Sequence, residues 1–165
     1  MERLSDPFED FDVWQDSPNV IARPPWIVFW FLVVGLASGQ LVETPALYEP
    51  VQYLGGAGLL IGGFALMASA MKSFRSAGTA VETWRSTTKI VDTGPYGSTR
   101  NPIYVSMLLI YMGIGVIANA PSVVALAPLL FGVLHFGVVL REEDYLECKF
   151  GDRYLAYNQV VPRWG

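Results

Sequence analysis

The chain has 165 residues, of which 52% are hydrophobic and 16% are charged, and its formal net charge is −4 at pH 7. This length is typical of one domain, and the share of charged residues is smaller than the surface of an ordinary soluble domain carries. The sequence shows no basic surface of the kind that binds nucleic acid, and its single cysteine, Cys148, excludes an internal disulfide.

Residues 1–22 form an acidic arm. The first 19 residues contain six Asp and Glu residues, and their only basic residue is Arg3. No apolar stretch follows Met1, so the arm does not have the pattern of a secretory signal peptide. Its apolar residues recur at near-helical spacing, which leaves open a short surface helix, packing over the cytoplasmic part of the chain, or disorder.

Four apolar blocks follow, at about 26–43, 53–72, 103–119 and 122–140, and charged residues occur only at their edges. A helix needs about 20 apolar residues to cross a bilayer, and the four blocks have about that length. Helices buried in a soluble bundle would show a polar stripe, whereas these blocks are apolar all round. We therefore predict an all-α polytopic membrane protein with four transmembrane helices.

The basic residues predict the orientation of these helices. All 11 Lys and Arg residues precede the first block, lie between the second and third, or follow the fourth, and the connections at 44–52 and 119–122 have none. The positive-inside rule makes the basic side cytoplasmic, so both termini are expected in the cytoplasm. A membrane domain at 23–165 then has a cytoplasmic loop at 73–102 and a C-terminal cytoplasmic helix at 141–162. This helix is expected to extend the fourth transmembrane helix and, after an interruption at Gly151, to continue as a short amphipathic helix. The compactness of the domain is typical of a bacterial inner membrane protein.

Glycine and proline mark three further features. Gly58 and Gly62 form a GxxxG pair, which predicts close approach of another helix. Asn119-Ala-Pro121 predicts a tight turn between the third and fourth helices. Pro128, inside the fourth block, is a candidate for a kink.

Two cytoplasmic segments carry specific motifs, GPYGSTRNPIY at 94–104 and REEDYLECKFGDRYLAY at 141–157. Together they resemble the isoprenylcysteine carboxyl methyltransferase family and its phospholipid N-methyltransferase relatives. The shared pattern is a Gly-x-Tyr turn, an Arg-His-Pro or Asn-Pro step with a nearby Tyr, a membrane hairpin, Glu-Glu, and Phe-Gly-x-x-Tyr. The resemblance covers about residues 73–164, and the first two helices match only in hydropathy.

The resemblance implies that S-adenosylmethionine binds between the cytoplasmic loop and the extension of the last helix, with S-adenosylhomocysteine as the product. Carried over by position, the implied cofactor-binding residues are Lys89, Ile90, Val91, Tyr96, Arg100, Asn101, Pro102, Tyr104, Glu142 and Glu143. An arginine suits the cofactor's carboxylate, Glu142 and Glu143 suit its ammonium or ribose hydroxyls, and Tyr96 or Tyr104 suits its adenine. No Gly-rich fingerprint of a Rossmann domain occurs.

Arg100, Glu142 and His135 are the candidate catalytic residues. His135 precedes Glu142 by seven residues, so both lie on one helix face, about 10 Å apart along the axis. The hypothesis is that His135 lines the path of the substrate, and the alternative is a hydrogen bond to a neighbouring helix. Arg100 also has an ordinary interpretation as an interfacial residue, Pro102 as a helix start, and the run from Glu142 to Asp144 as a solvated face.

We therefore expect a membrane enzyme that methylates a lipophilic acceptor arriving from the bilayer, with no resident metal. The resemblance favours an isoprenylcysteine carboxyl O-methyltransferase, with a phospholipid N-methyltransferase as the alternative, because Asn101 stands where the prenylcysteine enzymes usually have His. The sequence shows no unambiguous base, which favours a carboxylate or an already neutral amine as the nucleophile. A nicotinamide-dependent reductase of related fold and a non-catalytic membrane scaffold remain open, as does the oligomeric state.

Overall fold

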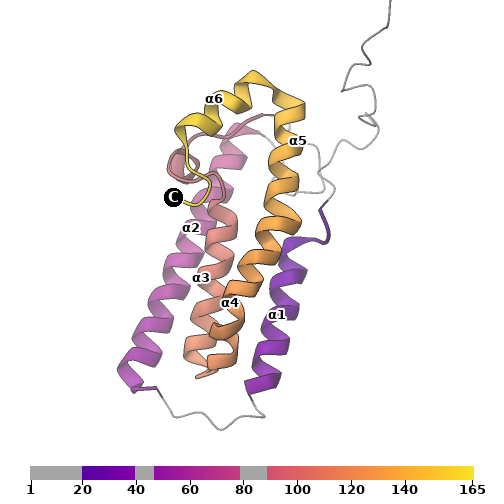
Figure 1. The fold of residues 1–165 in the computed structure, drawn as a ribbon. Coiled ribbons are helices and arrows are strands. Elements are labelled where there is room, and N and C mark those ends of the chain that lie inside the picture. Colours follow the sequence, from indigo (N-terminus) through magenta and orange to yellow (C-terminus); the bar gives the residue numbers. More distant parts are fainter. Residues whose placement is uncertain (1–19, 40–46, 79–88) are drawn as a thin grey trace, which may run out of the picture.

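The computed structural model describes residues 20–39, 47–78 and 89–165. Of these residues 81% are helical and none lies in a strand, which confirms the all-α fold. The expectations for the acidic arm fall almost wholly outside the described residues, as do part of the 44–52 connection and residues 79–88 of the cytoplasmic loop. Figure 1 shows a bundle of long, roughly parallel rods with shorter elements gathered at one end.

Helices make up nearly all of the described chain, and two π-helical turns are continuous with them. In chain order the elements are α1 (Pro24–Gly39), the π-helical turn η1 (Val51–Gly55), α2 (Gly56–Ala77), the 3₁₀ turn η2 (Gly94–Gly97), α3 (Pro102–Ile117), α4 (Pro121–Leu134), the π-helical turn η3 (His135–Val139), α5 (Leu140–Phe150) and α6 (Asp152–Val160). The turn η1 leads directly into α2, and η3 joins α4 and α5 into one rod.

Prolines and glycines set the helix ends. Pro24, Pro102 and Pro121 are the first residues of α1, α3 and α4, where a missing N–H costs no hydrogen bond and the fixed φ suits a helix. Gly78 ends α2 in the left-handed conformation, with φ 68°, and its N–H donates to the carbonyl of Arg75. Gly151 separates α5 from α6 with a φ of 53°, at the interruption expected from the sequence.

Two of the rods are long and apolar enough to cross a membrane, Val51–Ala77 with 27 residues and Pro121–Phe150 with 30. The other two apolar helices, α1 and α3, have 16 residues each. Each predicted apolar block therefore corresponds to an apolar helix, while only two of them have full spanning length within the described residues. A membrane-spanning role for all four remains a prediction.

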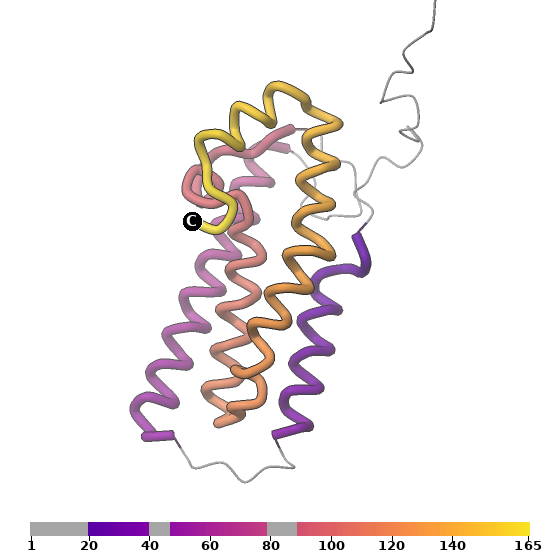
Figure 2. Tube along the Cα trace, in the orientation of Figure 1, coloured from indigo at the N-terminus to yellow at the C-terminus, as the bar shows by residue number. Residues whose placement is uncertain are grey.

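The helices pack in the order α2, α3, α4, α1, so that α3 and α4 form the centre (Figure 2). Gly56 and Gly63 on α2 allow the contact with α3, because a Cβ at Gly63 would lie 2.8 Å from Ile110 Cγ1 and 3.1 Å from the backbone of Ser106. The expectation for Gly58 and Gly62 was wrong for this contact. The Cβ positions at these two glycines meet no described side chain within 4 Å.

The segment before α1 packs against η3. The N–H of Ile21 donates to the carbonyl of Gly137 over 3.2 Å, and the Ile21 side chain covers the space that a Cβ on Gly137 would need. Gly137 lies inside this π-helical turn. The contact places the segment before α1 beside η3, on the side of the bundle toward η2, α6 and the C-terminus (Figure 1).

Candidate active site

A cavity of about 400 Å³ lies at this end of the bundle. Its walls come from the start of α1, the second half of α2, residues 89–101, the start of α3, and α5 and α6. This volume lies within the range of small-molecule binding sites. The walls divide into a charged part, an aromatic part and an apolar part.

Most of the residues expected to bind the cofactor line this one cavity. They are Lys89, Ile90, Val91, Tyr96, Arg100, Asn101, Tyr104, Glu142 and Glu143. Pro102 does not line it, because it is fully buried as the first residue of α3. The structure thus brings together residues that lie up to 54 positions apart in the sequence, from Lys89 to Glu143.

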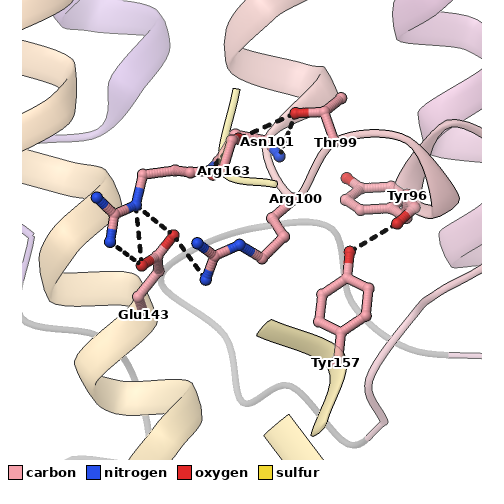
Figure 3. A network of polar contacts seen from close by, with 7 residues as sticks. All are labelled: Tyr96, Thr99, Arg100, Asn101, Glu143, Tyr157 and Arg163. Atoms are coloured by element: carbon pink, nitrogen blue, oxygen red, sulfur yellow. Dashed lines mark hydrogen bonds and ion pairs between the residues drawn. The ribbon is translucent and has the colours of Figure 1, made fainter. Parts of the chain in front are cut away.

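The charged wall is built around Glu143 (Figure 3). Arg163 donates to both of its carboxylate oxygens, through Nε over 2.9 and 3.1 Å and through Nη2 over 2.7 Å. Arg100 lies on the other side, with Nη1 3.3 Å from Glu143 Oε1. The side chains of Arg100 and Glu143 are 8% and 11% exposed, so this ion cluster lies mostly out of water. The hydrogen bonds to Glu143 raise the pKa of Arg163.

Arg100 is only partly satisfied by these contacts. Its Nε and Nη1 atoms are buried and have no hydrogen-bond partner. A buried guanidinium nitrogen without a partner costs free energy, so these two atoms favour a ligand that can accept hydrogen bonds. Arg100 is thus the residue of the charged wall that best suits an anion.

Glu142 is a second carboxyl group that faces the cavity, separate from the Glu143 cluster. It accepts a hydrogen bond from the Tyr104 hydroxyl over 2.7 Å. Burial raises the pKa of Glu142 to about 7, the bond from Tyr104 opposes this effect, and the charge of Glu143 adds to it. Glu142 lies two residues after Leu140, where the apolar part of its helix ends. Because its pKa is about 7, Glu142 can change its charge near neutral pH.

The aromatic wall comes from η2, α2 and α6. The ring of Tyr96 contacts Phe74 edge to face, with the centroids 5.2 Å apart, and the Tyr157 hydroxyl donates to the Tyr96 carbonyl over 2.8 Å. Burial raises the pKa of Tyr96 and Tyr157, and it raises that of Tyr154 to about 12. These phenols therefore stay neutral in the physiological range and can serve as hydrogen-bond donors and as flat surfaces.

The apolar wall comes from α1, α2 and α3. It is lined by Met67, Met71, Ile103, Met107, Pro24 and Pro25. Three methionines in one wall give a flexible apolar surface that can adapt to different hydrophobic shapes. The cavity thus joins a polar end that suits a charged small molecule to an end that suits a hydrocarbon chain.

His135 lies elsewhere. It is the first residue of η3, it does not line the cavity, and its ring contacts Phe131, Phe136 and Trp164 at centroid distances of 5.9, 4.7 and 5.8 Å. Its Nδ1 atom is buried without a hydrogen-bond partner. The surroundings are those of an aromatic cluster, and its proposed place along a substrate path has no support from the lining of this cavity.

Several residues of the site did not appear among the sequence predictions. Tyr154 ends the Phe-Gly-x-x-Tyr motif and Tyr157 follows three positions later, so the motif pointed to this wall without assigning its residues. Met67 and Met71 of α2 lie in the second apolar block, which was predicted from hydropathy alone and contains no motif of the site. Arg163 lies near the end of the chain in no motif, and no pattern signals its contact with Glu143.

Comparisons with known proteins match the part of the chain that contains most of the cavity wall. The profile of a family described as phospholipid methyltransferase matches residues 51–153, from η1 to the start of α6. The nickel-cobalt-cadmium resistance protein NccN of Alcaligenes xylosoxydans xylosoxydans and the cobalt-zinc-cadmium resistance protein CzcN of Cupriavidus metallidurans are 34% and 32% identical over 78 residues. Those residues are 47% of this chain and 36% of each relative, so the match spans about a third of the relatives' length.

A third relative is much shorter. An uncharacterized protein of Haemophilus influenzae is 36% identical over 63 residues, which are 38% of this chain and 98% of that protein. No solved structure matches the chain significantly.

Proposed function

The chain belongs to the phospholipid methyltransferase family, a family of membrane methyltransferases, and we propose that it transfers a methyl group from S-adenosylmethionine to a lipophilic acceptor. The sulfonium of the cofactor supplies an activated methyl group. The residues of the protein then have to bind the cofactor, orient it and admit the acceptor, because alignment of the reacting groups accounts for much of such a rate enhancement.

The observation that carries this proposal is the separation of opposite charges in one cavity. Arg100 has two buried guanidinium atoms without hydrogen-bond partners, and Glu142 presents a carboxyl group outside the Glu143 cluster. The amino-acid part of S-adenosylmethionine carries a carboxylate and an ammonium, which suit Arg100 and Glu142 respectively. The aromatic wall around Tyr96 and Tyr157 offers surfaces for adenine.

The acceptor is proposed to lie against the apolar wall. Met67, Met71 and Met107 line the cavity on the side of the bundle centre, where a hydrocarbon chain loses no hydrogen bonds. A prenylated cysteine with a free carboxylate and an aminophospholipid both have an apolar part and a nucleophile. The cavity is therefore compatible with an amine as well as with a carboxylate as the nucleophile.

The same proposal includes four membrane spans with both termini in the cytoplasm, in the inner membrane of a bacterium. The Lys and Arg residues of the described segments lie toward the cavity end of the bundle, and the turn at Asn119 on the opposite end has none. Cys148 is exposed and is the only cysteine, so it can report the orientation. A membrane-impermeant maleimide should label it in inside-out vesicles, whereas labelling from outside intact spheroplasts would contradict this topology.

Methyl transfer tests the function directly. Membranes that contain the protein would be incubated with S-adenosylmethionine labelled in its methyl group, together with an aminophospholipid or a farnesylated cysteine. We expect label in one lipid-extractable product with the wild type and at least tenfold less with Arg100→Gln, because that variant loses a charge-assisted contact. The exposed variant Arg153→Gln is the matched control. No labelled product with either acceptor or with a total lipid extract would count against the proposal.

A further inference from the structure

The last five residues, 161–165, lie along the loop that carries Arg100. The Arg100 N–H donates to the carbonyl of Pro162 over 3.0 Å. The carbonyl of Arg163 accepts two further bonds, from the Thr99 hydroxyl over 3.0 Å and from the Asn101 side-chain amide over 3.1 Å. The tail thus pairs with three consecutive residues of the loop, of which Thr99 and Asn101 are shown beside Arg163 in Figure 3. The tail lies outside the segment that the family profile matches.

The side chain of Arg163 completes this arrangement at Glu143. It forms three hydrogen bonds with the two carboxylate oxygens, the shortest of 2.7 Å. Arg100 stays at 3.3 Å from the same carboxylate, and its Nη1 atom lacks the geometry of a hydrogen bond there. Of the two arginines, Arg163 therefore satisfies Glu143, and Arg100, a residue of the cavity wall, keeps two donors without a partner.

The contact of both arginines with Glu143 determines the net charge of the cluster. Two guanidinium groups share one carboxylate, so the cluster of Arg100, Glu143 and Arg163 has a net charge of about +1 at neutral pH. Without Arg163 the remaining pair would be neutral, and Arg100 would be the closest cation able to compensate a mostly buried Glu143. An uncompensated buried carboxylate is costly, which favours movement of Arg100 onto Glu143 and away from a ligand.

We propose that Arg163 is a positioning residue for the cofactor: it holds Glu143 so that Arg100 stays available for the carboxylate of the methionine part. This inference rests on the proposed function, since it assumes that the cavity binds S-adenosylmethionine. It assigns Arg163 no contact with the cofactor or with the acceptor. The effect of the residue is expected to depend on the carboxylate of the ligand and on the positive charge of the side chain.

Two ligands separate this role from a general structural one. S-adenosylhomocysteine has the carboxylate, whereas 5′-methylthioadenosine keeps the nucleoside and lacks the amino-acid part. For Arg163→Gln we expect about tenfold or weaker binding of S-adenosylhomocysteine, the size typical of a lost charge-assisted bidentate contact, with 5′-methylthioadenosine bound within twofold of the wild type. Arg163→Lys restores the charge and is expected to recover part of the affinity. Arg153→Gln removes an exposed arginine of α6 and should change neither ligand.

The outcomes distinguish this inference from the proposed function. If the wild type binds S-adenosylhomocysteine and Arg163→Gln binds it equally well, the positioning role is wrong and the proposed function stands. If Arg163→Gln weakens both ligands alike, or Arg163→Lys is as impaired as Arg163→Gln, the residue is structural and the inference is overturned. If a folded wild type binds no S-adenosylhomocysteine, the proposed function itself fails.

Discussion

Glu142 and Tyr104 form the contact on which the behaviour of the cavity with pH should depend. The hydrogen bond from Tyr104 lowers the pKa of Glu142 against the effect of burial, and the result is about 7 in place of 4.5. The carboxyl group of the free protein is therefore largely neutral below pH 7 and charged above it. Only the charged form attracts an ammonium group strongly.

Binding of S-adenosylhomocysteine should accordingly weaken as the pH falls through 7. In Tyr104→Phe the opposing hydrogen bond is lost, so the pKa of Glu142 rises and the midpoint moves upward by about one to two pH units. Calorimetric titrations between pH 5.5 and 9 would measure this shift. Binding of 5′-methylthioadenosine, which has no ammonium, should be flat over the same range. Wild-type binding that does not change across pH 7 would show that charged Glu142 does not bind the ammonium, and an unchanged midpoint in Tyr104→Phe would show that the Tyr104 bond does not set the pKa of Glu142.

Among individual residues, the sequence predicted the polar side chains of the cavity wall better than it predicted which side chains they contact. Arg100, Tyr104 and Glu142 belong to motifs, and the structure places all three in the cavity wall. The contact between Glu143 and Arg163 joins positions 20 apart across the bend at Gly151, and neither motif spacing nor hydropathy encodes it. The sequence likewise placed His135 on the face of Glu142, whereas the π-helical turn η3 separates their surroundings.

Among the elements, the contact between α2 and α3 holds the two sides of the cavity together. Helix α2 contributes Met67, Met71 and Phe74, and the start of α3 contributes Tyr104. Their close packing depends on Gly56 and Gly63, which meet α3 with almost no space for a Cβ. The GxxxG spacing drew attention to Gly58 and Gly62 instead, because a spacing rule does not say which face of a glycine-rich helix meets its neighbour.

Two neighbouring glycines provide a matched test of this packing. A Cβ at Gly63 would lie 3.1 Å from the backbone of Ile110 and of Ser106, so Gly63→Ala must push α2 away from α3. We expect it to cost about 1–3 kcal/mol. Gly62→Ala meets nothing within 4 Å and should be neutral or slightly stabilising, since alanine favours a helix. Thermal unfolding in detergent would compare them, and equal unfolding temperatures would contradict the packing described.

For the whole molecule, hydropathy was enough to predict an all-helical bundle and the approximate place of each long helix. The charged segment after Leu140 was predicted to extend the fourth helix, and the structure confirms this, because α4, η3 and α5 are continuous over 30 residues. That continuity is what brings Glu142 and Glu143 over the start of α3. The cavity thus exists because a long helix extends past its apolar region and α6 folds back across its end.

The central claim is that this cavity binds a cofactor with both an ammonium and a carboxylate. Calorimetric titration of S-adenosylhomocysteine into the detergent-purified protein at pH 8, beside Glu142→Gln, tests it most directly. Binding by the wild type, weakened about tenfold or more in Glu142→Gln and unchanged in the exposed variant Arg153→Gln, is the predicted result. A folded wild type that binds no S-adenosylhomocysteine, or a Glu142→Gln variant that binds it as tightly as the wild type, would contradict the account.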